Sequence, residues 1–255
     1  MIHRYFIKLS FYGTNYHGWQ TQDNSLCIQS VMNHALSVIL RKDIDITGAG
    51  RTDAGVHARE FFAHFDTELI LDSEKQKKLI YNLNGYLPDD IVVHSAFEVR
   101  SDAHARFSAI SRTYQYIITT KKDPFLNGLA YRYTGHLDID LMNKGADIIK
   151  ENSDFTSFAK LPSETKTNIC RVTHARWNVH DNQLIFTITA DRFLRNMVRA
   201  IVGTLIDLGR NRLKLEDIEK IILAKDRSAA GYSVPACGLC LVSVQYPESI
   251  FLKQN

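Results

Sequence analysis

Residues 44–65, IDITGAGRTDAGVHAREFFAHF, contain two strand-like segments separated by a glycine-rich loop. Residues 44–47 predict a short strand, and residues 56–65 predict a longer one. The loop between them contains three glycines within eight residues, which is typical of a turn. Two consecutive strands at this place determine the fold, because a helix is predicted on either side of them.

Outward from this stretch, the chain continues the pattern on both sides. Residues 3–12 alternate as a strand, and residues 25–40 carry an apolar stripe at helical spacing. The alternating apolar face of that first strand consists of Tyr5, Ile7, Leu9 and Phe11. Downstream, Ser73 and Gln76 form a capping-box pattern that opens a helix ending before Pro88, and 91–99 is a strand. The predicted order is therefore strand, helix, strand, strand, helix, strand.

The second half of the chain repeats this order with one extra helix. Its predicted strands are 113–120, 167–179, 184–190 and 239–246, and its predicted helices are 139–149, 193–208 and 215–224. We therefore predict an α+β protein with two tandem ferredoxin-like (βαββαβ) halves and mainly antiparallel sheets. The periodicity breaks at 100–105, which divides the chain into an N-terminal half, 1–105, and a C-terminal half, 106–255.

The composition is that of a folded protein. The chain has 255 residues, of which 45% are hydrophobic and 23% are charged, and this excludes a disordered chain. The longest apolar run, 200–206, is far too short for a membrane helix, and residues 1–5 lead directly into a strand, so we expect no signal peptide. The four cysteines, Cys27, Cys170, Cys237 and Cys240, are scattered in a way that favours a reducing cytoplasm.

The glycine-rich loop allows two interpretations. It places Arg51, Thr52 and Asp53 between glycines that permit unusual backbone angles or close approach of another backbone. Its spacing matches neither a dinucleotide fingerprint nor a P-loop. From the spacing alone, a tight turn in which Asp53 caps backbone groups is the simpler interpretation, and a reactive carboxylate held by flanking strands is the alternative.

Positive charge is clustered in two places, although the net charge is only +3. In the predicted helix 193–208 and just before it, Arg192, Arg195 and Arg199 fall at i, i+3 and i+7, which predicts one helical stripe. This stripe is either a solvated basic face or a binding surface, and Arg199, with its apolar neighbours, requires a partner. Arg112, just before the predicted strand 113–120, would share a face with Tyr114 and Tyr116 if the extended chain begins there, which suits RNA bases and phosphates or an ordinary aromatic core.

Several chemical constellations are absent from the sequence. Cys237 and Cys240 form a single CxxC without a second pair or a nearby histidine cluster, so we expect no metal site. No metalloprotease helix motif or nucleophile-elbow motif occurs. On the residues alone, an RNA-modifying enzyme, an RNA-binding module without catalysis and a nucleotide-dependent enzyme all remain open.

Six motifs together resemble the tRNA pseudouridine synthase A family, in family order and across nearly the whole chain. They are Tyr16-His17-Gly18-Trp19-Gln20, Gly50-Arg51-Thr52-Asp53-Ala54-Gly55-Val56-His57-Ala58, His104-Ala105-Arg106-Phe107-Ser108-Ala109, Tyr114-Gln115-Tyr116, Asp154-Phe155-Thr156-Ser157-Phe158 and Phe193-Leu194-Arg195-Asn196-Met197-Val198-Arg199. The chain departs from the family at Cys240, where a tyrosine is usual, and at Thr21, where a basic residue is frequent.

The resemblance implies an isomerase with the pseudouridine synthase fold. It would convert uridine to pseudouridine at positions 38, 39 and 40 in the anticodon stem-loop of tRNA, without a cofactor or a metal. Asp53 would be the essential catalytic residue and would act at the ribose of a flipped uridine, either by adding to C1′ or by taking a proton from C2′. The uracil would then detach, turn and rejoin through C5.

The resemblance also assigns binding roles. Tyr114 would stack on the target base, Arg199 would pair with Asp53, and Leu239 would lie near the base. Arg51, Arg106 and Arg195 would contact the substrate, the last two through its phosphates. Because Asp53 lies in the first half and Tyr114 and Arg199 in the second, we expect an active-site cleft between the halves. The family is homodimeric, which predicts a cytoplasmic homodimer with tRNA as its partner.

Overall fold

The computed structural model describes residues 1–160 and 167–252, and the chain divides into two compact units. Unit 1 comprises Met1–Ile110 and Leu241–Asn255, and unit 2 comprises Ser111–Cys240. The first part of unit 1 ends close to the predicted boundary between 105 and 106. The units differ from the predicted halves in that the last residues of the chain belong to the first unit.

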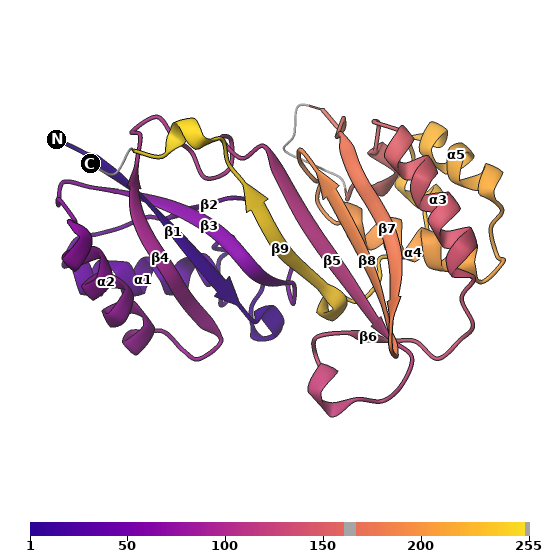
Figure 1. The fold of residues 1–255 in the computed structure, drawn as a ribbon, viewed down its shortest axis with the longest axis horizontal. Coiled ribbons are helices and arrows are strands. Elements are labelled where there is room, and N and C mark those ends of the chain that lie inside the picture. The colour runs from indigo at the N-terminus through magenta and orange to yellow at the C-terminus, as the bar shows by residue number, and fades with distance from the viewer. Residues whose placement is uncertain (161–166, 253–255) are drawn as a thin grey trace. The chain divides into compact units, whose positions relative to one another are not determined.

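Within unit 1, the α-helices and strands of residues 3–99 follow the predicted order. They are β1 (His3–Phe11), α1 (Ile28–Leu40), β2 (Thr47–Gly48), β3 (His57–Thr67), α2 (Ser73–Tyr86) and β4 (Ile91–Val99) (Figure 1). β1 pairs antiparallel with both β3 and β4, and β2 pairs antiparallel with β3. The final strand, β9 (Leu239–Gln245), lies next to β3, and its residues from Leu241 onward belong to unit 1. The two helices pack against each other, and α2 also packs against β4.

Both faces of β1 are covered. Tyr5, Ile7 and Leu9 are fully buried, as the alternation predicts. Phe6 points to the opposite face and is also fully buried, because the rings of Phe97 and Tyr246 pack against it, with centroids at 6.2 and 5.3 Å. The residues that follow β9 therefore complete a second apolar layer on the sheet of unit 1.

Two local predictions in unit 1 need correction. The predicted strand 44–47 is shorter and later, because β2 contains only Thr47 and Gly48. Ser73 does not cap α2. The cap is Asp72, whose carboxylate accepts a hydrogen bond from the backbone N–H of Lys75 at 2.9 Å. Gln76 instead donates from its side chain to the carbonyl oxygen of Leu71.

Unit 2 places helices against an antiparallel sheet. Its elements are β5 (Ser111–Thr119), β6 (Tyr131–Arg132), α3 (Ile139–Glu151), β7 (Val172–His180), β8 (Gln183–Ala190), α4 (Met197–Gly209) and α5 (Leu215–Ala224). β8 lies between β5 and β7 and pairs antiparallel with each, and the two-residue β6 pairs parallel with β5. α3 packs against β7, α4 and α5. Asp181, in the turn between β7 and β8, has a φ of 51°.

The predicted arginine stripe does not form. α4 begins at Met197 rather than at 193, because Asn196 adopts a left-handed conformation with φ at 66°. Arg192 and Arg195 therefore lie before the helix, and only Arg199 lies within it. The three arginines do not share a helical face.

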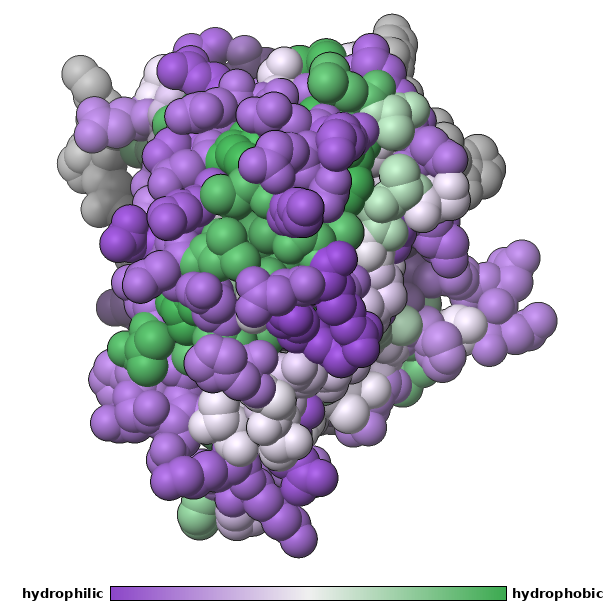
Figure 2. Space-filling model, turned by 90° about the vertical axis from the view of Figure 1, so that its right-hand side faces the viewer, coloured by the Kyte–Doolittle hydropathy of each residue, from purple (hydrophilic) through white to green (hydrophobic). Residues whose placement is uncertain are grey.

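Figure 2 shows the molecule from the side on which α5 lies in Figure 1, with a band of apolar residues bordered by hydrophilic ones. Leu223 on α5 is 75% exposed and is among the exposed apolar residues of unit 2. Among residues 1–160 and 167–252, every helix is too short or too polar to span a bilayer.

Candidate functional site

The loop that carries Asp53 runs between β2 and β3 in unit 1. At its start, the backbone N–H of Ala49 donates to the carbonyl oxygen of Phe62 at 2.7 Å. At its end, the N–H of Val56 donates to the carbonyl oxygen of Asp53 at 3.2 Å. Gly55 has a φ of 77°, which explains a glycine at this position. The Asp53 residue is half-buried, and Arg51 is exposed.

A second segment, residues 12–19, holds this loop from behind. The N–H of Gly55 donates to the carbonyl oxygen of Tyr16, and the N–H of Gly13 donates to Nδ1 of buried His57 at 3.0 Å. A Cβ at Gly13 would collide with the carbonyl oxygen of Val56, and one at Gly18 would collide with that of Thr52. The two backbones therefore approach each other as closely as glycine permits.

Aromatic packing fixes the same segment against the sheet. Trp19 stacks on Phe61 with centroids 4.2 Å apart, and a Cβ at Gly48 would lie 2.5 Å from the Trp19 indole. Tyr12 stacks on His57 at 4.8 Å. The loop is therefore rigidly supported, which is the property required of a segment that positions a reactive side chain.

Next to Asp53, the hydroxyl oxygen of Thr52 is buried. Within the described parts of the chain it has no hydrogen-bond partner. Such an atom is costly in a folded protein unless a ligand or solvent satisfies it. The backbone carbonyl of the same residue lies against Gly18, so the position of Thr52 is set by the segment that supports the loop.

In unit 2, the two predicted tyrosines of β5 differ in burial. Tyr114 pairs with Ile188 of β8, is half-buried and meets the ring of Phe193 edge to face at 5.2 Å. Tyr116 is fully buried, and its hydroxyl donates to the carbonyl oxygen of Pro235 at 2.9 Å. Burial strongly raises the pKa of Tyr116, so its phenol stays protonated. Tyr116 is a core residue.

Arg199 and the segment before β9 are joined directly. The Nε–H of Arg199 donates to the carbonyl oxygen of Val234 at 2.8 Å, and the N–H of Val234 donates back to the carbonyl oxygen of Arg199. A Cβ at Gly238 would lie 2.7 Å from the Tyr116 ring, which seats this segment on β5. Leu239 follows it and is 6% exposed. Unit 2 thus brings Arg199 and the segment leading to Leu239 together.

The remaining predicted arginines occupy separate places. Arg195 is exposed, Arg192 donates to the carbonyl oxygen of Thr167 at 3.0 Å, and Arg112 donates to that of Asp191 at 2.8 Å. Arg106 is exposed in unit 1, with its guanidinium 5.5 Å from the centroid of the Phe107 ring. Asp53, Arg51 and Arg106 belong to unit 1, whereas Tyr114, Arg195, Arg199 and Leu239 belong to unit 2.

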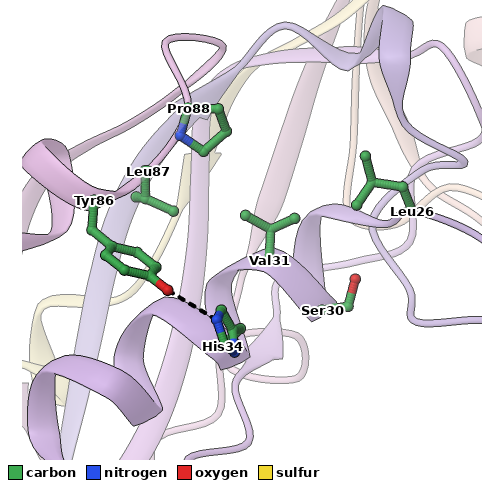
Figure 3. Close-up of a pocket in the computed structure, with 7 residues that line it drawn as sticks. All are labelled: Leu26, Ser30, Val31, His34, Tyr86, Leu87 and Pro88. Carbon is green, nitrogen blue, oxygen red and sulfur yellow. Dashed lines mark hydrogen bonds between the residues drawn. The ribbon is translucent and has the colours of Figure 1, made fainter.

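A cavity of about 300 Å³ lies elsewhere in unit 1, between α1 and the end of α2. Figure 3 shows Tyr86 reaching across it to His34, with the phenol oxygen 2.9 Å from Nε2, and Val31 and Leu87 lining its walls. None of the predicted site residues is part of its lining. In the described residues, no cluster of three or more His, Cys, Asp or Glu side chains has the geometry of a metal site.

Comparison with known proteins identifies the family. The family model for tRNA pseudouridine synthase matches residues 152–247. A tRNA pseudouridine synthase A from Bacteroides thetaiotaomicron is 50% identical over 257 aligned residues, covering 100% of this chain and 94% of the relative.

The chain belongs to the tRNA pseudouridine synthase A family. A relative from Azobacteroides pseudotrichonymphae is also 50% identical, and its alignment covers 98% of this chain and 99% of the relative. A relative from Clostridium acetobutylicum is 39% identical, and its alignment covers 94% of this chain and 98% of the relative. The tRNA pseudouridine synthase A family is thus matched over essentially the full chain length.

The sequence did not predict which residues support the Asp53 loop. Gly13, His57 and Tyr16 anchor the Asp53 loop, yet none was a candidate. Tyr16 and His57 belong to two of the six motifs, whereas Gly13 lies outside all of them. An isolated glycine or a buried histidine has no distinctive spacing that would predict this role. His104 belongs to one of the six motifs but has no predicted role, although its imidazole contacts both Arg106 and Phe107.

Proposed function

We propose that this protein isomerises uridine to pseudouridine at positions 38, 39 and 40 in the anticodon stem-loop of tRNA. The observation that carries the proposal is the full-length similarity to proteins named tRNA pseudouridine synthase A, at 50% identity. The reaction breaks the bond between N1 of uracil and C1′ and forms one between C5 and C1′. The C5 proton leaves and N1 gains a proton, so the balance requires no co-reactant.

In this proposal Asp53 is the essential catalytic residue. Its carboxylate acts at the ribose of the target uridine, either by adding to C1′ or by removing the C2′ proton. Both routes require an ionised carboxylate at a fixed position. The hydrogen bonds and glycine contacts that hold residues 49–56 support this role.

Tyr114, Arg199 and Leu239 complete the proposed site. The base must leave its stack to react, and a half-buried aromatic ring and an apolar side chain suit the walls of its pocket. A guanidinium favours the ionised form of a neighbouring carboxylate, which is the role proposed for Arg199 toward Asp53. We assign Arg51, Arg106 and Arg195 to contacts with the RNA, mainly with phosphates.

The proposal includes the finer architecture and assembly. The N-terminal half, 1–105, supplies Asp53, and the C-terminal half, 106–255, supplies Tyr114 and Arg199 to a cleft between two ferredoxin-like halves. The element order of residues 3–99 supports the first of these halves. We further propose a cytoplasmic homodimer in which both copies contribute to binding one tRNA.

The decisive experiment replaces the carboxylate of Asp53. Asp53→Asn and Asp53→Ala are expected to fold, to bind unmodified tRNA with wild-type affinity within about threefold, and to form no detectable pseudouridine. The measurement is pseudouridine mapping at 38–40 in tRNA transcripts, together with a binding isotherm. Asp43→Asn, which changes an exposed carboxylate outside the loop, is the matched control and is expected to keep full turnover.

Normal turnover by Asp53→Ala would contradict the proposed role of Asp53. Binding of tRNA by the wild-type protein without any pseudouridine would instead contradict the enzymatic proposal and favour an RNA-binding module.

A further inference from the structure

Residues His104–Ser108, here the His104 loop, present an aromatic ring to solvent from a tightly bonded backbone. Phe107 is 74% exposed, and the guanidinium of neighbouring Arg106 lies 5.5 Å from its ring centroid. With most of its surface exposed, the Phe107 ring gains little from burial. Its position therefore calls for an explanation other than core packing.

The backbone of the His104 loop is fixed from several directions within unit 1. The N–H of buried Ala105 donates to Nδ1 of His64 at 3.2 Å, and the carbonyl oxygen of Ala105 accepts from the Tyr246 hydroxyl at 2.5 Å. The loop also closes on itself, because His104 and Ser108 exchange two hydrogen bonds of 2.9 Å. Just before it, Arg4 donates to the carbonyl oxygen of Ala103 at 2.9 Å.

The imidazole of His104 determines how Arg106 and Phe107 are presented. Its Nδ1 accepts from the N–H of Arg106 at 3.0 Å and from that of Phe107 at 3.4 Å. The same ring packs against Phe107 at 4.4 Å and against His64 at 4.7 Å. One side chain thus bonds both backbone amides and supports the aromatic ring.

This arrangement requires a neutral imidazole, because a protonated Nδ1 cannot accept. Burial and the charges of Arg4 and Arg106 lower the pKa of His104, which keeps the ring neutral near pH 7. The pKa of His64 is also lowered, to about 4, chiefly by burial. The bonding pattern of the loop is therefore complete under physiological conditions.

We propose that Phe107 is a stacking platform for an unpaired base of the substrate RNA, and that His104 is the positioning residue that presents Phe107 and Arg106 to it. The inference rests on the proposed function, since tRNA supplies the ligand. An exposed ring beside a guanidinium matches the two chemistries of a nucleotide, a flat base and a phosphate. Preorganisation of the loop reduces the entropy that is lost on binding.

The first test concerns Phe107. Phe107→Ala is expected to raise KM for unmodified tRNA and Kd for an anticodon stem-loop RNA by about tenfold, with kcat unchanged. Phe107→Trp should retain wild-type affinity, whereas Phe107→Leu should behave like the alanine variant because it lacks a ring. The loss should persist at high salt, whereas the effect of Arg106→Ala should shrink as salt rises. Tyr81→Ala, which removes an 80% exposed ring on α2, is the matched control with no expected effect.

The second test concerns His104. His104→Ala is expected to raise KM severalfold without changing kcat, and His104→Asn should restore much of the affinity, because its Oδ1 can accept the same two N–H groups. If His104 acts through Phe107 and Arg106, adding His104→Ala to the double variant Phe107→Ala/Arg106→Ala should cause no further loss of affinity. Additive losses would overturn the positioning role.

The outcomes separate this inference from the proposed function. If the wild-type protein forms pseudouridine while Phe107→Ala keeps wild-type KM and Kd, the platform is contradicted and the function stands. If the wild-type protein forms no pseudouridine but Phe107→Ala weakens RNA binding, the function is contradicted and the platform stands. A protein partner captured through Phe107, with RNA binding unaltered, also contradicts the platform.

Discussion

His64 shows how one buried residue ties the N-terminal sheet to a distant loop. It lies on β3, is 6% exposed and bonds the N–H of Ala105 through Nδ1. Burial, Arg4 and His104 all lower its pKa, against a smaller opposing effect of Asp66. A histidine held neutral in this way makes the stability of the fold depend on pH.

We expect the free energy of unfolding to fall as the pH is lowered from about 6.5 to about 4. In this range the unfolded state binds a proton that folded His64 excludes, so acid favours unfolding by at most about 3 kcal/mol. Urea denaturation at a series of pH values measures the slope. His64→Asn keeps an acceptor but cannot titrate, and it should flatten the profile over this range. An unchanged slope in that variant would contradict the assignment to His64.

At the residue scale, the sequence predicted apolar burial better than polar burial. Tyr5, Ile7 and Leu9 are buried because their alternation has a geometric cause in the strand itself. The roles of His64 and His104 depend on backbone amides far along the chain or around a loop. No local spacing encodes such a contact.

At the level of elements, the sequence predicts the extent of a helix from its apolar spacing better than it predicts the residue at which the helix begins. The periodicity of α5 predicts its limits, 215–224, in full, whereas α2 and α4 begin differently from expectation. An N-cap depends on one side chain and its backbone angles, and Asp72 and Ser73 are both acceptable caps in sequence. The left-handed Asn196 likewise shortens α4 without altering the apolar pattern that predicted it.

The cap of α2 yields a direct prediction. Asp72→Ala should lower the free energy of unfolding, because the N–H of Lys75 loses its acceptor. Asp72→Asn, which keeps an accepting oxygen, should cost much less, and Ser73→Ala should be nearly neutral. Chemical denaturation of the three variants measures the difference. A larger loss from Ser73→Ala than from Asp72→Ala would show that the capping box predicted from the sequence operates after all.

For the whole molecule, the most consequential feature is the return of the chain to unit 1 after Cys240. Tyr246 packs on Phe6 and Phe62, with centroids at 5.3 and 5.2 Å, and bonds Ala105. We expect Tyr246→Ala to destabilise unit 1 by about 3 kcal/mol through the lost packing. Hydrogen exchange should show faster exchange in β1 and β3, with α3 and β7 of unit 2 little changed. Tyr246→Phe, which keeps the ring, should have the smaller effect. Equal acceleration in both units would contradict this view.

At this scale the sequence predicted the order of elements but not where the last strand belongs. Residues 239–246 alternate as any strand does, and alternation carries no information about its neighbours. Assignment of Leu241 and its successors to unit 1 depends on pairing across most of the chain length. The residues of the candidate site follow from motifs that occur together in family order rather than from any periodicity, and their roles stay predictions.

The discontinuity of unit 1 also has a consequence for biosynthesis. Unit 2 is a single uninterrupted stretch, Ser111–Cys240, whereas unit 1 consists of two stretches on either side of it, so unit 2 is synthesised before the second stretch of unit 1. The first stretch of unit 1 is synthesised first, but its Phe6 is covered by the ring of Tyr246 only after the second stretch has been made. A nascent chain that has not yet reached Tyr246 therefore leaves Phe6 without one of the rings that cover it, and exposed aromatic surface of this kind is what chaperones bind.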